Sequence, residues 1–338
     1  MTTWADAHTR GHVAASELHA DLGTDLGRPV DVFGAVRRLG LVLAFAQLGP
    51  VSGMYLPRKP QSGIILHEGH PRTRQRYTAG HELGHHVFGH TPAADLDLAG
   101  ALQRDAGRSW TGDEKEAEAF GAWFLMPRKV LRAGMKALDV NRPTGPLDVY
   151  ALSLWLGTSY TATARQLANA KIVDTHAADQ WAKVPPRDIK TLLAGRHVPD
   201  DLHNDVWWLD RGGHPAPLDA RPGDRIVLTL KETPGSGFSW RIADLPPFMR
   251  LLADSFKEPW ESQLDNAEAR EHAEGDVHPR SLVMEIDPAA GLSMEHLRLI
   301  KDQPWDPGPA SEELELLVSV SPRLHGIQLP EAELALAA

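Results

Sequence analysis

The stretch His-Glu-Leu-Gly-His at residues 81–85 determines how the first half of this sequence is interpreted. Residues four positions apart lie on one face of a helix, so the two imidazoles would stand one turn apart, with the carboxylate of Glu82 beside the first. This spacing is typical of catalytic zinc sites, in which two histidines bind the metal and the glutamate takes a proton from water. Pro71 and the apolar residues around the motif predict a helix over residues 73–87.

A catalytic zinc of this kind takes three protein ligands, so a third ligand must come from elsewhere in the chain. The extended motif with a further Gly and His fails here, because its two positions hold Phe88 and Thr91. Residues 113–127 predict a second helix, with acids in its first turns, an apolar body and an end at Pro127. The acids of this helix are therefore the next candidates.

These two segments resemble the paired motifs of the ImmA/IrrE family of zinc metallopeptidases. Residues 76–85 read Arg-Tyr-Thr-Ala-Gly-His-Glu-Leu-Gly-His. Residues 114–120 read Glu-Lys-Glu-Ala-Glu-Ala-Phe, and residues 124–127 read Phe-Leu-Met-Pro, in the order that the family shows. The resemblance covers about residues 10–200 and implies a mostly helical, zincin-like metallopeptidase domain with a small sheet and a bound Zn²⁺.

The resemblance implies that His81 and His85 are zinc ligands, that Glu82 is the general base and that Glu114 is the third ligand. The position of Glu114 also suits this role. It shares a helical face with two small residues, at positions 117 and 121, which would let the two helices lie close together. The sequence thus predicts a site made by three side chains from two neighbouring helices.

Three other polar residues near the motifs bear on the site. Glu118 stands where the family has Asn, and it is either a rival for the third ligand or a candidate for orienting a ligand histidine through its other ring nitrogen. Glu116 points to another helical face and is interpreted as a solvated side chain. His90 is interpreted as an ordinary polar residue of a helix end.

The composition limits the class of protein. The chain has 338 residues, 42% of them hydrophobic, a length that predicts two domains. It has no cysteine, which excludes disulfides and thiolate ligands and fits a reducing cytoplasm. The first ten residues lack the apolar core of a signal peptide, and we expect a cytoplasmic protein with no membrane association. The formal charge of −10 argues against general nucleic-acid binding.

The rest of the first half predicts short helices over residues 14–22 and 30–39 and strands over residues 41–45, 53–56 and 63–66. Residues 148–173 have the helix, tight turn and helix rhythm of a helix-turn-helix unit. Because the second of these helices offers only Arg165 as a cation, packing within the domain is favoured over DNA reading.

Beyond about residue 200 the pattern becomes alternating and strand-like. Residues 230–240 read Leu-Lys-Glu-Thr-Pro-Gly-Ser-Gly-Phe-Ser-Trp and resemble a binding loop of the chagasin family of cysteine-peptidase inhibitors. Residues 303–305, Gln-Pro-Trp, are similar to the third loop of that family. The resemblance covers about residues 205–322. It implies an immunoglobulin-like β-sandwich whose loops bind a papain-type peptidase, with these candidate binding residues: Pro234, Gly235, Ser236, Gly237, Phe238, Pro304 and Trp305.

We therefore expect an α+β protein with a metallopeptidase domain at residues 1–200 and a β-sandwich domain at residues 201–338. The ImmA/IrrE resemblance implies site-specific cleavage of a helix-turn-helix repressor in a stress or mobile-element response. Two alternatives stay open. The chain could be a protein-binding or peptidase-inhibitor module with a regulatory front domain, or a transcriptional regulator that uses residues 148–173.

Overall fold

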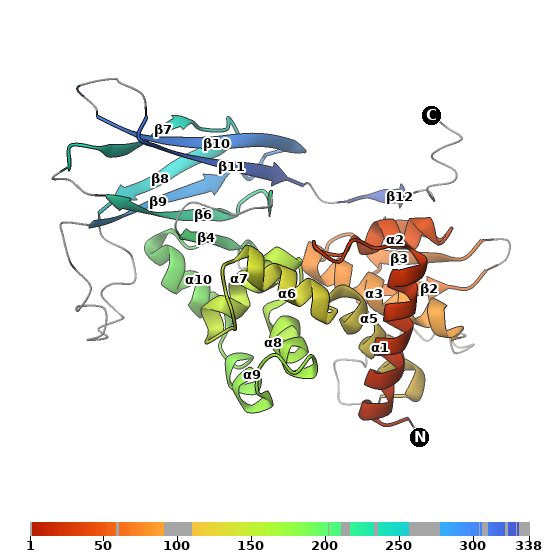
Figure 1. Ribbon diagram of the computed structural model, residues 1–338. Helices are drawn as coiled ribbons and strands as arrows, with labels where there is room; N and C mark the ends of the chain where they lie inside the picture. The colour runs from red at the N-terminus through yellow and green to blue at the C-terminus, as the bar shows by residue number, and fades with distance from the viewer. Residues whose placement is uncertain are drawn as a thin grey trace. The chain divides into compact units, whose positions relative to one another are not determined.

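The computed structural model describes residues 2–58, 61–90, 110–201, 203–210, 217–232, 236–256, 278–303, 305, 310–321, 324–328 and 330. The chain divides into two compact units. The first unit is Met1–Lys183 together with Arg323–Ala338, and the second is Val184–Pro322. The expected mixed α+β class is confirmed, with a helical region and a small sheet followed by further sheets (Figure 1).

The first unit combines helices with a small sheet, and α2 and α3 pack against that sheet. Its elements are α1 (Trp4–Asp21), α2 (Val32–Arg38), β1 (Val42–Ala46), β2 (Gly53–Leu56), β3 (Gly63–His67), α3 (Arg72–Phe88), α5 (Gly112–Leu125), α6 (Arg128–Ala137), α7 (Pro146–Leu156), α8 (Tyr160–Asn169), α9 (Thr175–Trp181) and β12 (Gly326–Gln328). The sheet order is β12-β1-β3-β2, with β1 and β3 parallel and the outer pairs antiparallel. The three strands and the helix expected between residues 41 and 87 are found to within one residue at each end.

Helix α1 starts well before the expected position. Thr3 caps its first turn, and Asp6 completes a reciprocal capping box with the backbone of Thr3. The helix buries Ala7, Gly11 and Ala15 against the core. Gly11 is needed there, because a Cβ on it would lie 2.7 Å from the backbone nitrogen of Phe120 on α5.

Helices α3 and α5 cross at a contact made of small residues, as the sequence predicts. A Cβ on Gly84 would lie 2.9 Å from Cα of Ala117, and a Cβ on Gly121 would lie 3.0 Å from the backbone nitrogen of His81. The fully buried side chains of Phe120 and Leu83 fill the adjoining core. This close approach brings the two sequence motifs together.

The second unit consists of one helix, a short 3₁₀ turn and two four-stranded sheets among its described residues. Its elements are α10 (Pro186–Ala194), η2 (Gly195–His197), β4 (Val206–Asp210), β5 (Leu218–Ala220), β6 (Arg225–Glu232), β7 (Ser239–Asp244), β8 (Met249–Ser255), β9 (His278–Ile286), β10 (Ser293–Asp302) and β11 (Glu312–Val320). The sheet orders are β5-β11-β10-β7 and β4-β6-β9-β8, and Figure 1 shows the two sheets as layers of a sandwich.

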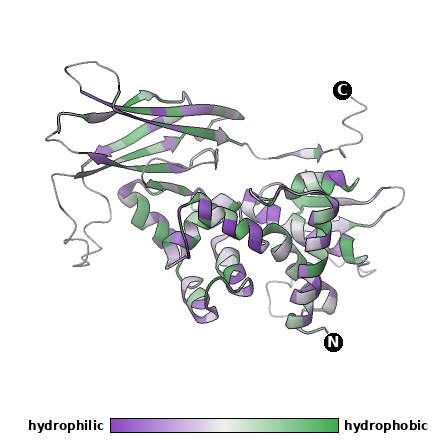
Figure 2. Cartoon of the chain, in the orientation of Figure 1, coloured by the Kyte–Doolittle hydropathy of each residue, from purple (hydrophilic) through white to green (hydrophobic). Residues whose placement is uncertain are grey.

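Alternation of buried and exposed residues along the strands explains this sandwich. On β11, Leu314, Leu316 and Val318 are buried while the residues between them are more exposed, which gives the sheet one apolar face. Figure 2 shows hydrophobic and hydrophilic residues interspersed along the strands in this way. Within the described part of the chain, no helix combines the length and apolarity needed to cross a bilayer.

Candidate metal centre

His81, His85 and Glu114 come together where α3 crosses α5. The Nε2 atoms of His81 and His85 are 3.1 Å apart. His81 Nε2 lies 3.2 Å from Glu114 Oε2, and His85 Nε2 lies 3.7 Å from Glu114 Oε1. Ligands bound about 2.0–2.1 Å from a tetrahedral zinc lie about 3.3 Å from one another. Two imidazole nitrogens and one carboxylate at these separations fit a zinc ion without rearrangement of the helices.

Local structure explains the position of each donor. His81 and His85 lie on one face of α3, four residues apart, as the motif requires. Glu114 lies in the first turn of α5, where its backbone N–H donates to the side chain of Thr111, the residue that caps the helix. Among the described residues, His81, His85 and Glu114 are the one group of three potential metal ligands whose donor atoms all lie within 4.8 Å of one another.

Glu82 is held by the edge strand β2. Its side chain is buried, and its Oε2 accepts a 2.9 Å hydrogen bond from the backbone N–H of Tyr55. The phenol of Tyr55 lies 3.0 Å from Nδ1 of His86, so this strand residue is bonded to α3 at two points. Sequence reasoning missed Tyr55. The strand could be predicted, but the pattern does not show that it runs beside the motif helix.

Glu118 contacts the other ring nitrogen of His81. Its Oε2 lies 3.2 Å from His81 Nδ1, and its Oε1 accepts a 2.8 Å hydrogen bond from the phenol of Tyr77. Glu118 therefore lies on the opposite edge of the imidazole from Glu114. Of the two roles open to it from the sequence, this position favours orienting the histidine over binding the metal.

The two carboxylates control the charge of His81. Burial by itself would lower the pKa of His81, but its hydrogen bonds to Glu114 and Glu118 outweigh burial and raise the pKa to about 10. Burial likewise opposes ionisation of Glu118, yet the hydrogen bond from His81 leaves the pKa of Glu118 below its ordinary value. A metal ion entering this group must therefore displace a proton from His81.

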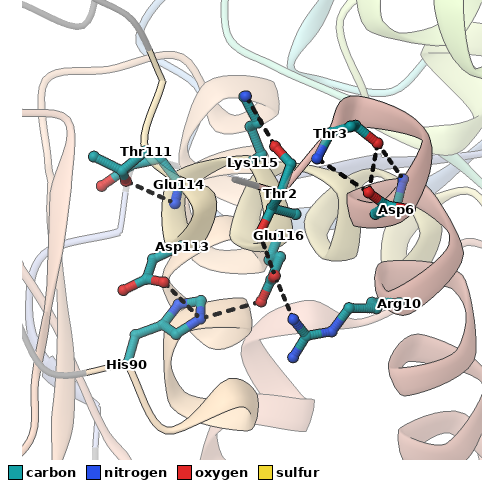
Figure 3. Close-up of polar contacts among 10 residues, drawn as sticks. All are labelled: Thr2, Thr3, Asp6, Arg10, His90, Thr111, Asp113, Glu114, Lys115 and Glu116. Atoms are coloured by element: carbon teal, nitrogen blue, oxygen red, sulfur yellow. Dashed lines mark hydrogen bonds and ion pairs between the residues drawn. The ribbon is translucent and has the colours of Figure 1, made fainter.

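Glu116 is not solvated, and the interpretation of this residue was wrong. Its side chain is 5% exposed and forms an ion pair with Arg10 of α1, while His90 lies on its other side (Figure 3). The face of α5 that carries Glu116 is covered because α1 packs against it. A pattern of residues within one helix does not reveal that second neighbour.

The helix-turn-helix segment packs inside the first unit. Helices α7 and α8 bury most of their apolar residues, and the turn between them contains Gly157 in a left-handed conformation. The guanidinium of Arg76, from the motif helix α3, donates to the carbonyl oxygens of Leu156 and Gly157. On α8 the charged side chain is Arg165, which is exposed. These contacts favour a packing role for the segment.

The predicted binding tips of the second unit are described in part. Pro234, Gly235 and Pro304 lie outside the described residues. Gly237 has a φ of +79°, and a Cβ on it would lie 2.8 Å from Cζ2 of Trp305, so the two tips meet. Trp305 is 72% exposed. The backbone N–H of Phe238 donates to the hydroxyl of Ser236, which closes the turn.

Solved structures show some similarity to about a third of the chain. The cysteine protease inhibitor EhICP2 from Entamoeba histolytica is 21% identical, with 35% of this chain and 97% of that chain covered and a TM-score of 0.27. Amebosin, in its solution structure, is 13% identical over 36% of this chain and 98% of its own, with a TM-score of 0.24. PbICP-C, in its complex with falcipain-2, is 12% identical, with 36% of this chain and 91% of that chain covered and a TM-score of 0.18.

No curated protein matches the sequence at a significant level. The family comparison gives a match within the first unit. Residues 36–140, which include His81, His85 and Glu114, match the Peptidase_M78 model, described as the IrrE N-terminal-like domain. A domain of this peptidase family implies a protein substrate, and the His-His-Glu group is consistent with a metallopeptidase site. Residues 36–140 of this chain are thus an IrrE N-terminal-like domain.

Proposed function

We propose that the first unit is a zinc-dependent endopeptidase. The observation that carries this proposal is the compact group of His81 Nε2, His85 Nε2 and the Glu114 carboxylate, with the buried carboxylate of Glu82 on the same helix as the two histidines. The donor set has the composition and spacing of a catalytic zinc site, which keeps a further position open for water.

Each residue of the site has a role in this proposal. The two histidines and Glu114 hold the metal, and zinc bound there supplies a Lewis acid that lowers the pKa of its water. Glu82 takes the proton of the attacking water on its carboxylate and returns it to the leaving amine. The N–H of Tyr55 fixes the orientation of that carboxylate by bonding to Oε2. Glu118 fixes the ring of His81.

For the substrate we propose a regulatory protein of the helix-turn-helix repressor class, cleaved at a specific site in the cytoplasm during a stress or mobile-element response. The ImmA/IrrE resemblance of the paired motifs supports this choice. The buried packing of α7 and α8 adds support, because it disfavours the alternative in which this chain itself reads DNA.

The proposal is tested by cleavage of a repressor encoded beside the gene for this chain, with products identified by mass spectrometry. The full chain loaded with zinc should cleave at one position. Glu82→Gln keeps the shape of the side chain and removes the base, so it should retain zinc while turnover falls by about 10²-fold or more. Unchanged turnover in zinc-loaded Glu82→Gln protein would remove Glu82 from the mechanism.

A second function is favoured by the exposed indole of Trp305 beside Gly237. A large aromatic side chain held at a turn is a common anchor for another protein. We propose that this tip of the second unit binds a protein partner, and the chagasin resemblance makes a papain-type peptidase the first partner to test. The full chain should inhibit papain, and the double variant Phe238→Ala with Trp305→Ala should not. Equal inhibition by the variant would exclude the tip as the contact.

A further inference from the structure

His85 has a second histidine behind it. Its Nδ1 lies 3.0 Å from Nδ1 of His90, and the two rings are inclined at 67°. Nε2 of His85 belongs to the group of metal-binding atoms, so in the metal-bound ring the lone pair of Nε2 is used and the proton sits on Nδ1. His85 Nδ1–H therefore donates, and His90 Nδ1 accepts.

The end of α3 places His90 at this point. The helix stops at Phe88, and Gly89 takes a left-handed conformation with a φ of 66°. The chain turns back, and the backbone N–H of His90 donates to the carbonyl oxygen of His85 at 2.9 Å. The ring of His90 also stacks against Phe88, with centroids 5.4 Å apart. Its ring is thus held by the cap of the helix that carries the ligands.

The other nitrogen of His90 faces two carboxylates, as Figure 3 shows. Nε2 lies 3.5 Å from Glu116 Oε2 and 3.8 Å from Asp113 Oδ1. Because Nδ1 accepts from His85, a neutral His90 carries its proton on Nε2, directed toward these oxygens. The Asp113 side chain is 65% exposed, whereas that of Glu116 is 5% exposed. Glu116 is therefore the partner with a fixed position.

Glu116 is fixed in turn by the first helix. Arg10 of α1 donates to Glu116 Oε1 at 2.5 Å, and the hydroxyl of Thr2 lies 3.4 Å from the same oxygen (Figure 3). A buried carboxylate without such partners would be costly, so these contacts explain how Glu116 remains in the interior. The contacts thus run from His85 through His90 and Glu116 to Arg10 on α1. Arg10 precedes His85 by more than 70 positions in the sequence.

The two ligand histidines are supported differently. Nδ1 of His81 lies against the carboxylate of Glu118, whereas Nδ1 of His85 lies against His90, whose Nε2 is 3.5 Å from Glu116 Oε2. We propose that His90, supported by Glu116, is a positioning residue that fixes the tautomer and orientation of His85 and so strengthens metal binding. This inference rests on the proposed function, because it takes His85 as a metal ligand.

The test compares substitutions of His90 in the full chain, with zinc affinity measured by competition against a chromophoric chelator. His90→Phe keeps a ring and removes both nitrogens, and it should lower zinc affinity by about 10- to 100-fold. His90→Asn places an amide oxygen near the position of Nδ1 and should restore most of the affinity. His90→Gln places its amide near the position of Nε2 and should not restore it.

Two further measurements separate positioning from a structural role. The thermal unfolding of the metal-free protein should differ little between His90→Asn and His90→Gln, and the visible spectrum of the Co²⁺-substituted protein should change in His90→Phe. Glu116→Gln should also weaken zinc binding, whereas Asp113→Asn, its exposed counterpart, should not. Wild-type zinc affinity in His90→Phe would overturn the inference, and so would an equal loss in all three His90 variants.

Control variants distinguish failure of this inference from failure of the proposed function. His176→Phe makes the same substitution at an exposed residue of α9 and should bind zinc like the wild type. His85→Ala should lose the metal. If His85→Ala retains full zinc occupancy, the proposed metal site is wrong and the inference fails with it. If His85→Ala loses zinc while His90→Phe does not, only the inference fails.

Discussion

Glu118 Oε2 lies 3.2 Å from Nδ1 of His81, on the opposite edge of the ring from Glu114. Because a carboxylate in this position orients a ligand imidazole and makes it more basic, Glu118→Gln should lower zinc affinity by about 10- to 100-fold. Glu114→Gln should have a larger effect, since it removes a ligand. Chelator competition on both variants checks this order. If Glu114→Gln kept zinc and Glu118→Gln lost it, Glu118 would be the ligand and Glu114 the residue that orients His81.

Gly84 and Gly80 face α5 with different clearances. A Cβ on Gly84 would lie 2.9 Å from Cα of Ala117, while a Cβ on Gly80 would lie 3.3 Å from Cα of Gly121. Gly84→Ala should therefore lower the free energy of unfolding by about 1–3 kcal/mol through overpacking. Gly80→Ala should cost less, because its Cβ has the larger clearance of 3.3 Å. The gain of about 0.5–1 kcal/mol that alanine brings to a helix interior applies to both variants and offsets more of the smaller cost. Urea unfolding compares the two variants, and a larger loss for Gly80→Ala would contradict the packing described.

His70 gives the first unit an acid sensitivity that does not involve the metal site. Burial, followed by the nearby Arg74 and His67, lowers the pKa of His70 from 6.5 to about 4. Between these values the unfolded chain binds a proton that the folded chain does not, so this residue destabilises the fold as the pH falls from about 6.5 toward 4. Above pH 6.5 it has no such effect, because the ring is neutral in both states.

The variant His70→Phe keeps a ring against His67 and cannot titrate. Relative to the wild type, its free energy of unfolding should rise steadily as the pH is lowered from 6.5 to 4, as measured by urea unfolding at several pH values. A difference between the two proteins that does not change with pH would show that the pKa of His70 is not lowered.

Strand β12 pairs with the edge of β1 in the first unit, with Gln328 opposite Leu43. Removing residues 324–338 should expose that edge and lower the free energy of unfolding by about 1–3 kcal/mol, since each lost backbone hydrogen bond contributes about 1 kcal/mol. His325→Ala is the matched control. It removes only the exposed contact with Glu68, which is worth little. Equal stability of the shortened chain and the full chain would show that β12 does not support the sheet.

The sequence predicts those features of the fold that depend on local signals. Periodicity and Pro71 give the motif helix α3 to within one residue at each end, and the second motif with Pro127 gives α5. The small residues Ala117 and Gly121 predict the close contact between these helices, which the structure contains. The start of α1 could also have been found, because Thr3 and Asp6 form a capping box readable from the sequence.

Other features depend on neighbours that are distant in the sequence. The burial of Glu116 requires Arg10 on α1, and the support of Glu82 requires the edge strand that carries Tyr55. The pairing of β12 with β1 joins segments separated by most of the chain. From the sequence alone, a polar residue on a helix is interpreted as solvated even when the fold pairs it with a charged residue of another element. Tertiary packing, which the periodicity of one element does not encode, decides these cases.

The central claim is that His81, His85 and Glu114 form a zinc site. Metal analysis of the purified full chain, by inductively coupled plasma mass spectrometry, tests it most directly. We predict about one zinc per chain in the wild type, because three such ligands make one catalytic site. Occupancy should be lost in His85→Ala and kept in Glu82→Gln, whose side chain is not a ligand. Full zinc occupancy in His85→Ala, or none in the wild type, would contradict the account.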